Sequence, residues 1–183
     1  MKFTIEKSMT TGKLPTNKVT WKVNTTCNYR CSYCLQSEFG VPPPSNIDDV
    51  ASLVSHSLKV PHDVKIMGGE VMINTEDIYK IVSKLERRSH WISLCSNMSA
   101  DVSAYMKIIE MCNGKFNQLQ ASLHLEYTKA EVFYEKCRVL RLSMPPHSRL
   151  DVVNVIQKGE KNIKRLVKLK RLFEAEGICF NTN

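Results

Sequence analysis

The sequence predicts an α/β fold in which parallel strands alternate with helices. Two patterns support this prediction. Short runs rich in β-branched and apolar residues recur along the chain, and longer segments with apolar residues three and four positions apart separate them. Strands and helices in this order normally pair in parallel through right-handed crossovers. A length of 183 residues is enough for one domain with a sizeable core.

Six segments have the length and composition of strands. The first alternates apolar and polar side chains from Val19 to Asn24, and the second ends at Gly68. The predicted strands are residues 19–24, 63–67, 91–96, 119–124, 150–156 and 177–181. Residues 1–16 are predicted to form an N-terminal extension that can add one more strand, and residues 17–183 are predicted to form the core domain.

Five helical segments lie between these strands. Asn46 and Asn74 stand at the start of the first two, and asparagine is a favoured N-cap residue. Pro145 and Gly177 follow the last two, where such residues end helices. The predicted helices are residues 46–58, 74–85, 101–111, 128–142 and 161–176. Since a closed barrel of eight βα units takes ~250 residues, the chain predicts a partial, open TIM-like barrel of about six βα units.

The composition excludes some classes of protein. No apolar run approaches the ~20 residues that span a bilayer, and residues 1–7 lack the apolar region of a signal peptide. We therefore expect a cytoplasmic protein without a membrane partner. The formal net charge of +8 attracts anionic substrates or partners, nucleic acid among them, but no nucleic-acid-binding motif supports that choice.

Cysteines are distributed unevenly. Three of the seven lie within the eight residues Cys27-Asn28-Tyr29-Arg30-Cys31-Ser32-Tyr33-Cys34, directly after the first predicted strand. Loops at the carboxyl ends of parallel strands are where such folds carry their chemistry. Clustered thiols in a reducing compartment indicate a metal site. The other four are predicted to be ordinary buried thiols: Cys95, Cys112, Cys137 and Cys179.

Zinc and an iron–sulfur cluster both suit such thiols. A structural zinc ion takes four ligands and is closed, yet no second Cys-Cys or Cys-His pair follows at the spacing of a zinc finger. Three ligands instead leave a coordination position open for a substrate or cofactor. From the residues alone, the zinc alternative stays open beside the cluster.

The spacing Cys-x3-Cys-x2-Cys, with an aromatic residue before the last cysteine, resembles the signature of radical SAM enzymes. This resemblance implies that Cys27, Cys31 and Cys34 bind three irons of a [4Fe-4S] cluster. S-adenosylmethionine (SAM) would then chelate the fourth iron through its amino and carboxylate groups. The resemblance also implies that Tyr33 packs near the adenine of SAM.

Two polar segments follow the next predicted strands. Gly68-Gly69-Glu70 resembles the Gly-Gly-Glu motif of the same superfamily, whose backbone meets the amino group of the methionine part of SAM. Glycine at a strand end also lets the backbone approach a ligand closely. Ser96 and Asn97 end the third strand and can hydrogen-bond a ribose or carboxylate, although Asn97 can equally cap the turn.

Ser122, His124 and Glu126 are predicted to share one face of the fourth strand. The resemblance implies polar contacts from this strand, with Ser122 a candidate for SAM and with His124 and Glu126 candidate catalytic residues that meet the substrate. In the superfamily the fifth strand edges the adenine pocket, which makes Asn154 a cofactor-binding candidate. Asn154 can also simply cap the strand end.

The resemblance implies an enzyme that cleaves SAM reductively to a 5′-deoxyadenosyl radical, which abstracts hydrogen from an unidentified small molecule, nucleotide or peptide. It also implies an electron donor of the flavodoxin or ferredoxin type. The basic face of residues 161–176 is a candidate docking surface for an acidic donor or a nucleic acid. Two alternatives remain: a glycyl-radical-type activating enzyme acting on a partner protein, and a basic nucleic-acid-binding module with a zinc site.

Overall fold

The computed structural model describes residues 2–7, 17–36, 39–155 and 160–182. Within these ranges, seven strands form one sheet in the order of the sequence. The strands are β1 (Lys2–Lys7), β2 (Asn17–Lys22), β3 (Asp63–Met67), β4 (Trp91–Ser96), β5 (Phe116–Leu123), β6 (Arg149–Asn154) and β7 (Cys179–Thr182). All neighbours from β2 to β7 pair in parallel, whereas β1 pairs antiparallel to β2.

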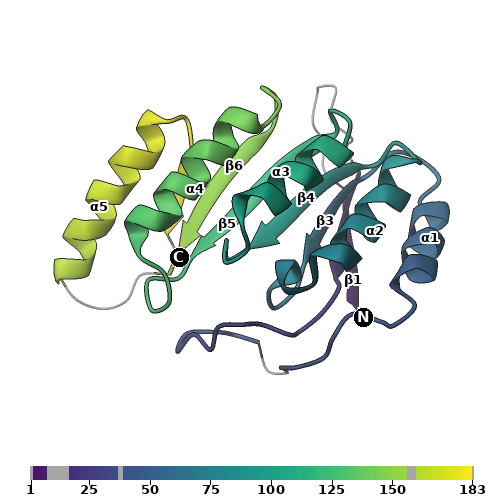
Figure 1. The fold of residues 1–183 in the computed structure, drawn as a ribbon, viewed down its shortest axis with the longest axis horizontal. Coiled ribbons are helices and arrows are strands. Elements are labelled where there is room, and N and C mark those ends of the chain that lie inside the picture. Colours follow the sequence, from purple (N-terminus) through teal and green to yellow (C-terminus); the bar gives the residue numbers. More distant parts are fainter. Residues whose placement is uncertain (1, 8–16, 37–38, 156–159, 183) are drawn as a thin grey trace.

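The sheet is curved but not closed. β1 and β7 are its two edge strands, so the six parallel strands form part of a barrel (Figure 1). The predicted α/β class and the open, partial TIM-like barrel are therefore confirmed. β1 lies in the predicted N-terminal extension, and residues 8–16 of that extension lie outside the described residues.

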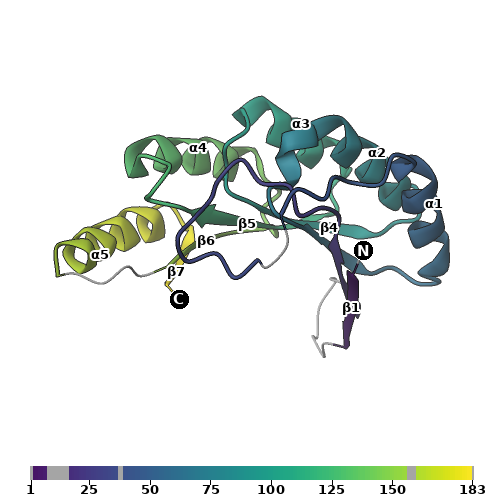
Figure 2. The same ribbon diagram turned by 90° about the horizontal axis from the view of Figure 1, so that it is seen from below.

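Helices follow the parallel strands and lie over one face of the sheet, as α1 to α4 show in Figure 2. They are α1 (Ile47–Ser57), α2 (Thr75–Glu86), α3 (Val102–Met111), α4 (Ala130–Ser143) and α5 (Glu160–Ala175), with a short 3-10 helix η1 (Val71–Asn74) before α2. None of the helices described here is both long enough and apolar enough to cross a bilayer.

Alternate side chains of the strands form the core beneath the helices. Trp21 of β2 pairs in register with Ile66 of β3, and both are fully buried among apolar residues of the helices. The intervening positions are polar and partly buried, as at Lys65 and Gln120. Lys65 Nζ donates a hydrogen bond to Gln120 Oε1 at 2.6 Å. The sheet therefore has one apolar, helix-covered face and one polar face.

The helix ends differ in detail from the predicted caps. The side chains of Asn46 and Asn74 make no capping hydrogen bond to their helices. Instead, the Asn46 carbonyl accepts from the backbone N–H of Asp49 and of Val50, as a helical residue's would. Gly177 after α5 does have a positive φ of 68°, which confirms it as the residue that ends this helix.

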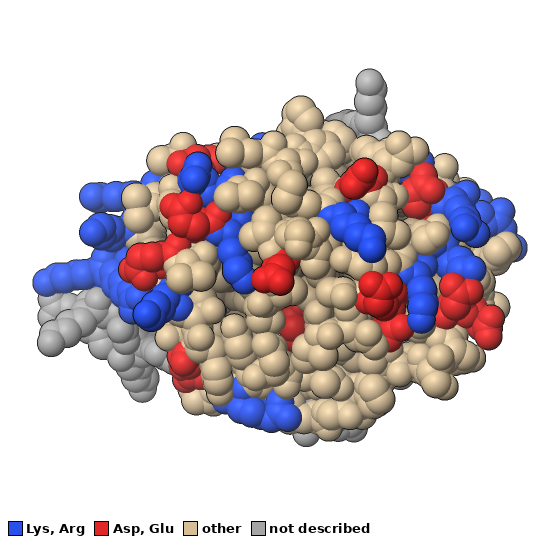
Figure 3. Space-filling model, in the orientation of Figure 1, with Lys and Arg blue, Asp and Glu red and all other residues tan. Residues whose placement is uncertain are grey.

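The surface of α5 has the basic character that the sequence predicts. Leu166, Leu169 and Phe173 are buried, while Lys and Arg side chains gather over this helix in Figure 3. Exposed basic residues on α5 are Lys164, Arg165, Lys168, Lys170 and Arg171. An amphipathic helix of the outer layer accounts for this pattern.

The isolated cysteines were predicted to be buried. Cys112 and Cys137 are buried, and Cys95 is partly buried. For Cys179 the prediction is wrong, because this residue is exposed on the edge strand β7, where alternate side chains face solvent.

Candidate metal and cofactor site

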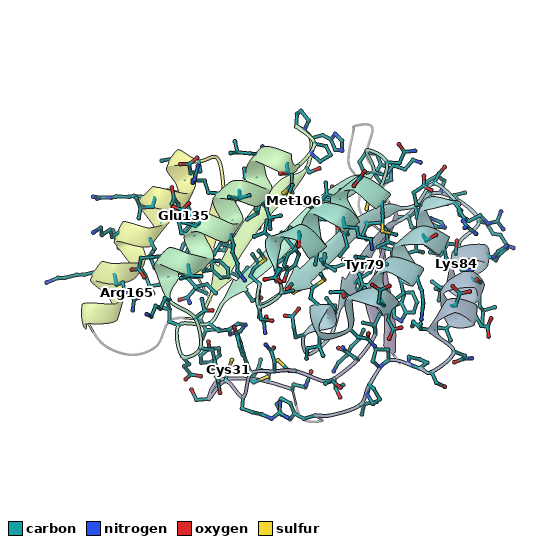
Figure 4. The ribbon with its side chains drawn as sticks, viewed as in Figure 1. Cys31, Tyr79, Lys84, Met106, Glu135 and Arg165 are labelled. Atoms are coloured by element: carbon teal, nitrogen blue, oxygen red, sulfur yellow. The ribbon has the colours of Figure 1, made fainter. Side chains whose placement is uncertain are left out.

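The three clustered cysteines lie on the long connection from β2 to α1. This connection runs along the carboxyl edge of the sheet, at the lower side of Figure 1, and Figure 4 shows Cys31 on it. Cys27 and Cys31 are partly buried and Cys34 is exposed. We call residues 27–34 the cysteine loop. It lies at the edge where the parallel strands end.

The base of this loop is fastened to the segment that follows β3. The backbone N–H of Gly69 donates to Asn24 Oδ1 at 3.1 Å, and that of Glu70 donates to the Thr26 carbonyl at 2.8 Å. A Cβ on Gly68 would lie 2.1 Å from Asn24 Oδ1, and one on Gly69 would lie 2.3 Å from the Thr26 carbonyl oxygen. Only glycine fits at these positions, because the two backbones touch.

Glu70 joins the segment after β3 to the end of β4 and to η1. Its side chain is fully buried, and the carboxylate accepts from Met72 N at 2.9 Å, from Ser96 Oγ at 2.8 Å and from Asn97 N at 2.5 Å. Burial raises the pKa of this carboxyl, while the three hydrogen bonds oppose the rise. All of these contacts are internal, so the Glu70 carboxylate acts here by holding β4 and η1 in place.

The predicted pair after β4 is also built into this network. Ser96 is buried and shares a 2.7 Å hydrogen bond with the Tyr105 hydroxyl. Asn97 accepts from Ser99 N through its Oδ1 and donates from Nδ2 to Asn28 Oδ1 at 2.9 Å. Asn97 therefore caps its own turn and, at the same time, reaches the cysteine loop.

The prediction that Ser122, His124 and Glu126 share a strand face is wrong. β5 ends at Leu123, and the His124 carbonyl then accepts from the N–H groups of Tyr127 and Thr128. The chain turns there, so His124 and Glu126 belong to the loop between β5 and α4. Ser122 alone stays on the strand.

Both loop residues face the cysteine loop. His124 Nδ1 lies 3.3 Å from Cys31 Sγ and 3.0 Å from the Tyr33 hydroxyl, and the Tyr33 and His124 rings are stacked. Glu126 accepts hydrogen bonds from the backbone N–H and the hydroxyl of Ser32. Burial lowers the pKa of His124, which favours the neutral ring, while Glu126 opposes this shift.

Two further candidates lie at the ends of β5 and β6. The Ser122 hydroxyl hydrogen-bonds the Cys95 thiol, whose pKa is raised by burial. Asn154 is only 2% exposed, and its Nδ2 donates to the Leu123 carbonyl at 2.7 Å. Its Oδ1 accepts no hydrogen bond from the residues that the structure describes. Such a buried acceptor at the edge of the sheet fits an N–H group of a bound cofactor.

Partial burial governs the thiol pKa of Cys27 and of Cys31. Burial raises the pKa of Cys27 and of Cys31, and nearby Glu70 and Glu126 add to the rise at Cys27 and Cys31 respectively. The nearby Cys34 thiol also raises the pKa of each of these two thiols. A bound cation reverses such shifts because it stabilises thiolates. Three thiols on one loop are the soft donor type that an iron–sulfur cluster takes.

The described residues contain no group of three His, Cys, Asp or Glu side chains drawn together closely enough for one metal ion. A [4Fe-4S] cluster binds each cysteine through a different iron atom. The fit of the cluster therefore rests on the type of donor and on the shared loop.

Sequence reasoning missed several residues that shape the site. Asn24 holds the backbone at Gly69, Ser32 is bonded by Glu126, and the hydroxyl of Tyr127 accepts from Arg30 N at 3.0 Å. Asn24 had a usable signal, since it is a polar residue at the end of the first predicted strand. Ser32 and Tyr127 had none, because their contacts join segments far apart in the sequence.

Comparison with known proteins identifies structural neighbours but no sequence family. No family model matches the chain, and no curated protein matches it. Among solved structures, Streptococcus suis SuiB bound to its precursor peptide SuiA superposes with a TM-score of 0.63 at 13% identity, over 88% of this chain and 39% of SuiB. The chain has the same fold. SuiB bound to S-adenosylmethionine gives a TM-score of 0.54 at 13% identity, over 90% of this chain and 48% of that one.

A second neighbour is anSMEcpe with bound AdoMet and the Cp18Cys peptide. Its TM-score is 0.59 at 15% identity, over 88% of this chain and 48% of anSMEcpe. The chain thus spans less than half the length of the proteins that it matches.

Proposed function

We propose that the chain is a radical SAM enzyme in which Cys27, Cys31 and Cys34 hold a [4Fe-4S] cluster. The observation that carries the proposal is the contact between the base of the cysteine loop and Gly68-Gly69-Glu70. Gly68-Gly69-Glu70 thus packs against residues 24–26, which lead directly into the cysteine motif. The fold shared with proteins crystallised with SAM supports the same conclusion.

When bound, the cluster and SAM supply one-electron reductive cleavage of the S–C5′ bond, which gives a 5′-deoxyadenosyl radical that abstracts hydrogen from the substrate. The chain's own residues hold and orient these groups. The three cysteines give up their thiol protons on binding metal. Gly68 and Gly69 keep the backbone next to the loop free of side chains.

The carboxyl edge also offers groups for SAM. In our proposal Asn154 Oδ1, which has no hydrogen-bond partner among the described residues, accepts an N–H of the cofactor, and Ser122 contributes a hydroxyl from β5. Tyr33 offers an aromatic surface close to Cys31, as a neighbour of adenine. Ser96, Asn97 and Glu70 serve the cofactor through the network that orders this edge.

The substrate proposed here is a peptide. SuiB was crystallised with its precursor peptide and anSMEcpe with the Cp18Cys peptide, which favours a peptide over a nucleotide or another small molecule. In our proposal a donor of the flavodoxin or ferredoxin type reduces the cluster in the cell. A substrate role for His124 and Glu126 stays a prediction, since their contacts are with the cysteine loop.

The test is anaerobic reconstitution of the purified chain with iron and sulfide. We expect bound iron and sulfide, a visible absorbance band, and release of 5′-deoxyadenosine from SAM after reduction by dithionite. Cys31→Ala should lose the band and the product. Cys179→Ala removes an exposed thiol far along the sequence and should lose neither.

Two results would contradict the proposal. One is a stoichiometric zinc ion with no iron or sulfide after anaerobic preparation. The other is a fully loaded cluster in wild-type protein that releases no more 5′-deoxyadenosine than Cys31→Ala does.

A further inference from the structure

The loop that follows β5 contacts the cysteine loop along most of its length. The Tyr127 ring stacks on Tyr29 with centroids 4.5 Å apart and planes 9° apart. The Tyr127 hydroxyl accepts from Arg30 N at 3.0 Å, and the Tyr29 hydroxyl lies 3.4 Å from Thr128 Oγ1. The first half of the cysteine loop is therefore bound through both ring stacking and a backbone hydrogen bond.

Glu126 and His124 bind the second half. The Glu126 carboxylate accepts from both donors of Ser32, the backbone N–H at 3.0 Å and the hydroxyl. His124 Nδ1 is within hydrogen-bonding distance of Cys31 Sγ and of the Tyr33 hydroxyl. Two residues between the first and last cysteines, Arg30 and Ser32, thus donate their backbone N–H groups to the loop that follows β5.

The cysteine loop has few bonds of its own. It contains no helix or strand, and its described internal bonds are short-range: Cys34 N to the Cys31 carbonyl, Tyr29 N to Cys27 Sγ, and the Arg30 guanidinium to nearby carbonyls. Fixing such a segment costs conformational entropy, which contacts from outside must offset. The contacts with residues 124–128 do this.

We propose that residues 124–128 form a clamp that fixes the cysteine loop before metal binds, and that His124 is a positioning residue which hydrogen-bonds the Cys31 sulfur. The part that concerns the bound cluster rests on the function proposed above, whereas the clamp itself does not. The clamp belongs to the βα unit three strands away from β2 and is not part of either motif in the sequence.

His124 has a second consequence for a bound cluster. A neutral ring with its proton on Nδ1 donates to the sulfur of Cys31 at the observed separation. Hydrogen bonds to the sulfur ligands stabilise the reduced state of an iron–sulfur cluster and raise its reduction potential. Loss of the ring should therefore shift the potential of the loaded protein downward without removing a ligand.

The clamp can be tested on the metal-free chain of 183 residues by amide hydrogen exchange. In Glu126→Ala, we expect exchange to accelerate several-fold in the segment of residues 28–34 and to remain at the wild-type rate in β3 and β4. Glu135→Ala is the matched control, because it removes the same charge from α4 where its partner is Arg138. Wild-type exchange rates in residues 28–34 of Glu126→Ala would overturn the clamp.

A second variant distinguishes the contribution of the Tyr127 ring from that of its hydroxyl. Tyr127→Phe keeps the stack on Tyr29 but removes the acceptor of Arg30 N, so exchange should rise at the Arg30 amide and not at Ser32. An unchanged Arg30 amide would show that this bond does not hold the loop in solution.

The role of His124 is tested on the reconstituted protein. His124→Ala should bind iron and sulfide as wild type does but show a lower midpoint potential, with His56→Ala on α1 unchanged. A loaded His124→Ala protein with the wild-type potential would overturn this role. Failure of wild type to bind iron would refute the proposed function instead, and the exchange experiments would still decide the clamp.

Discussion

Ile66 and Glu70 are four residues apart and both are completely buried, yet different interactions hold them. Ile66 lies in β3 among apolar side chains, pairs in register with Trp21 and needs only the right shape around it. Glu70 lies just beyond the carboxyl end of β3 and is held by hydrogen bonds from three residues. The sheet is thus stabilised by apolar packing, and its carboxyl edge is ordered by directional polar contacts.

The largest effect should come from the apolar side of this comparison. Ile66→Ala leaves a cavity under the helices and should lower the free energy of unfolding by about 2–5 kcal/mol. Denaturant titration measures the loss. Ile73→Ala, at a residue that is 47% exposed, is the control and should change stability little. A comparable loss of stability in both variants would mean that burial does not explain the effect of Ile66→Ala.

On the polar side, Glu70→Gln should cost about 1–3 kcal/mol. A glutamine amide keeps one acceptor, but its NH₂ group faces the backbone N–H of Met72 or of Asn97, which leaves a buried donor unpaired. Denaturant titration again gives the value. A Glu70→Gln protein as stable as wild type would show that the edge does not depend on the carboxylate.

We also expect the contribution of Glu70 to the free energy of unfolding to depend on pH. Burial raises the folded-state pKa of Glu70, so the folded chain binds its proton more tightly than the unfolded chain. Its contribution to stability is therefore greatest below the ordinary carboxyl pKa and is lost as the pH rises through the raised folded value. Asp63 shifts in the same direction, so the measurement is the difference between the wild-type and Glu70→Gln stability curves. The stability advantage of wild type over Glu70→Gln should shrink as the pH rises through the raised folded pKa of Glu70.

A local effect is expected at Gly69. In Gly69→Ala the new Cβ meets the Thr26 carbonyl, and relief of that overlap costs about 1–3 kcal/mol and displaces the base of the cysteine loop. Iron bound after reconstitution should fall. Gly114→Ala strains a residue with φ of 78° whose Cβ would meet nothing within 4 Å, so it controls for backbone strain alone. Equal iron in the two variants would contradict the contact model.

The smallest change in stability should be at Asn154. Asn154→Ala removes one hydrogen bond to the Leu123 carbonyl and should cost about 0.5–1.5 kcal/mol. Because Oδ1 has no partner among the described residues, the variant should weaken SAM binding more than it weakens the fold. Calorimetric titration of the reconstituted protein with SAM measures this. Wild-type affinity would remove Asn154 from the proposed cofactor site.

The strands and helices could be predicted from the sequence because each carries its own local pattern. The β3 and β4 boundaries match the prediction, whereas β5 begins at Phe116 rather than Leu119. The start of β5 is not recognisable in the sequence because Asn117 and Gln118 are polar. Asn117 is nevertheless buried, and its Nδ2 donates hydrogen bonds to Asp63 and Ser93. Polar residues of a strand give no apolar alternation to detect.

The candidate site was predictable only where its residues form a motif. The cysteines and Gly68-Gly69-Glu70 are contiguous and follow strands, so the sequence points to the carboxyl edge. The contacts of His124 and Glu126 could not be predicted, because they depend on where β5 ends and on a partner loop more than 90 residues away. Such tertiary contacts leave no trace in local periodicity.

The sheet follows the order of the sequence, so each strand adds beside the one made just before it. The cysteine loop is the exception, since Cys31 finds His124 only 93 residues later. On a ribosome, the cysteines therefore emerge well before the residues that hold them, and the early part of the sheet can form while they remain loose. If the proposed cluster forms, iron delivered during synthesis would meet an unordered segment, and loading would have to wait until β5 has joined the sheet.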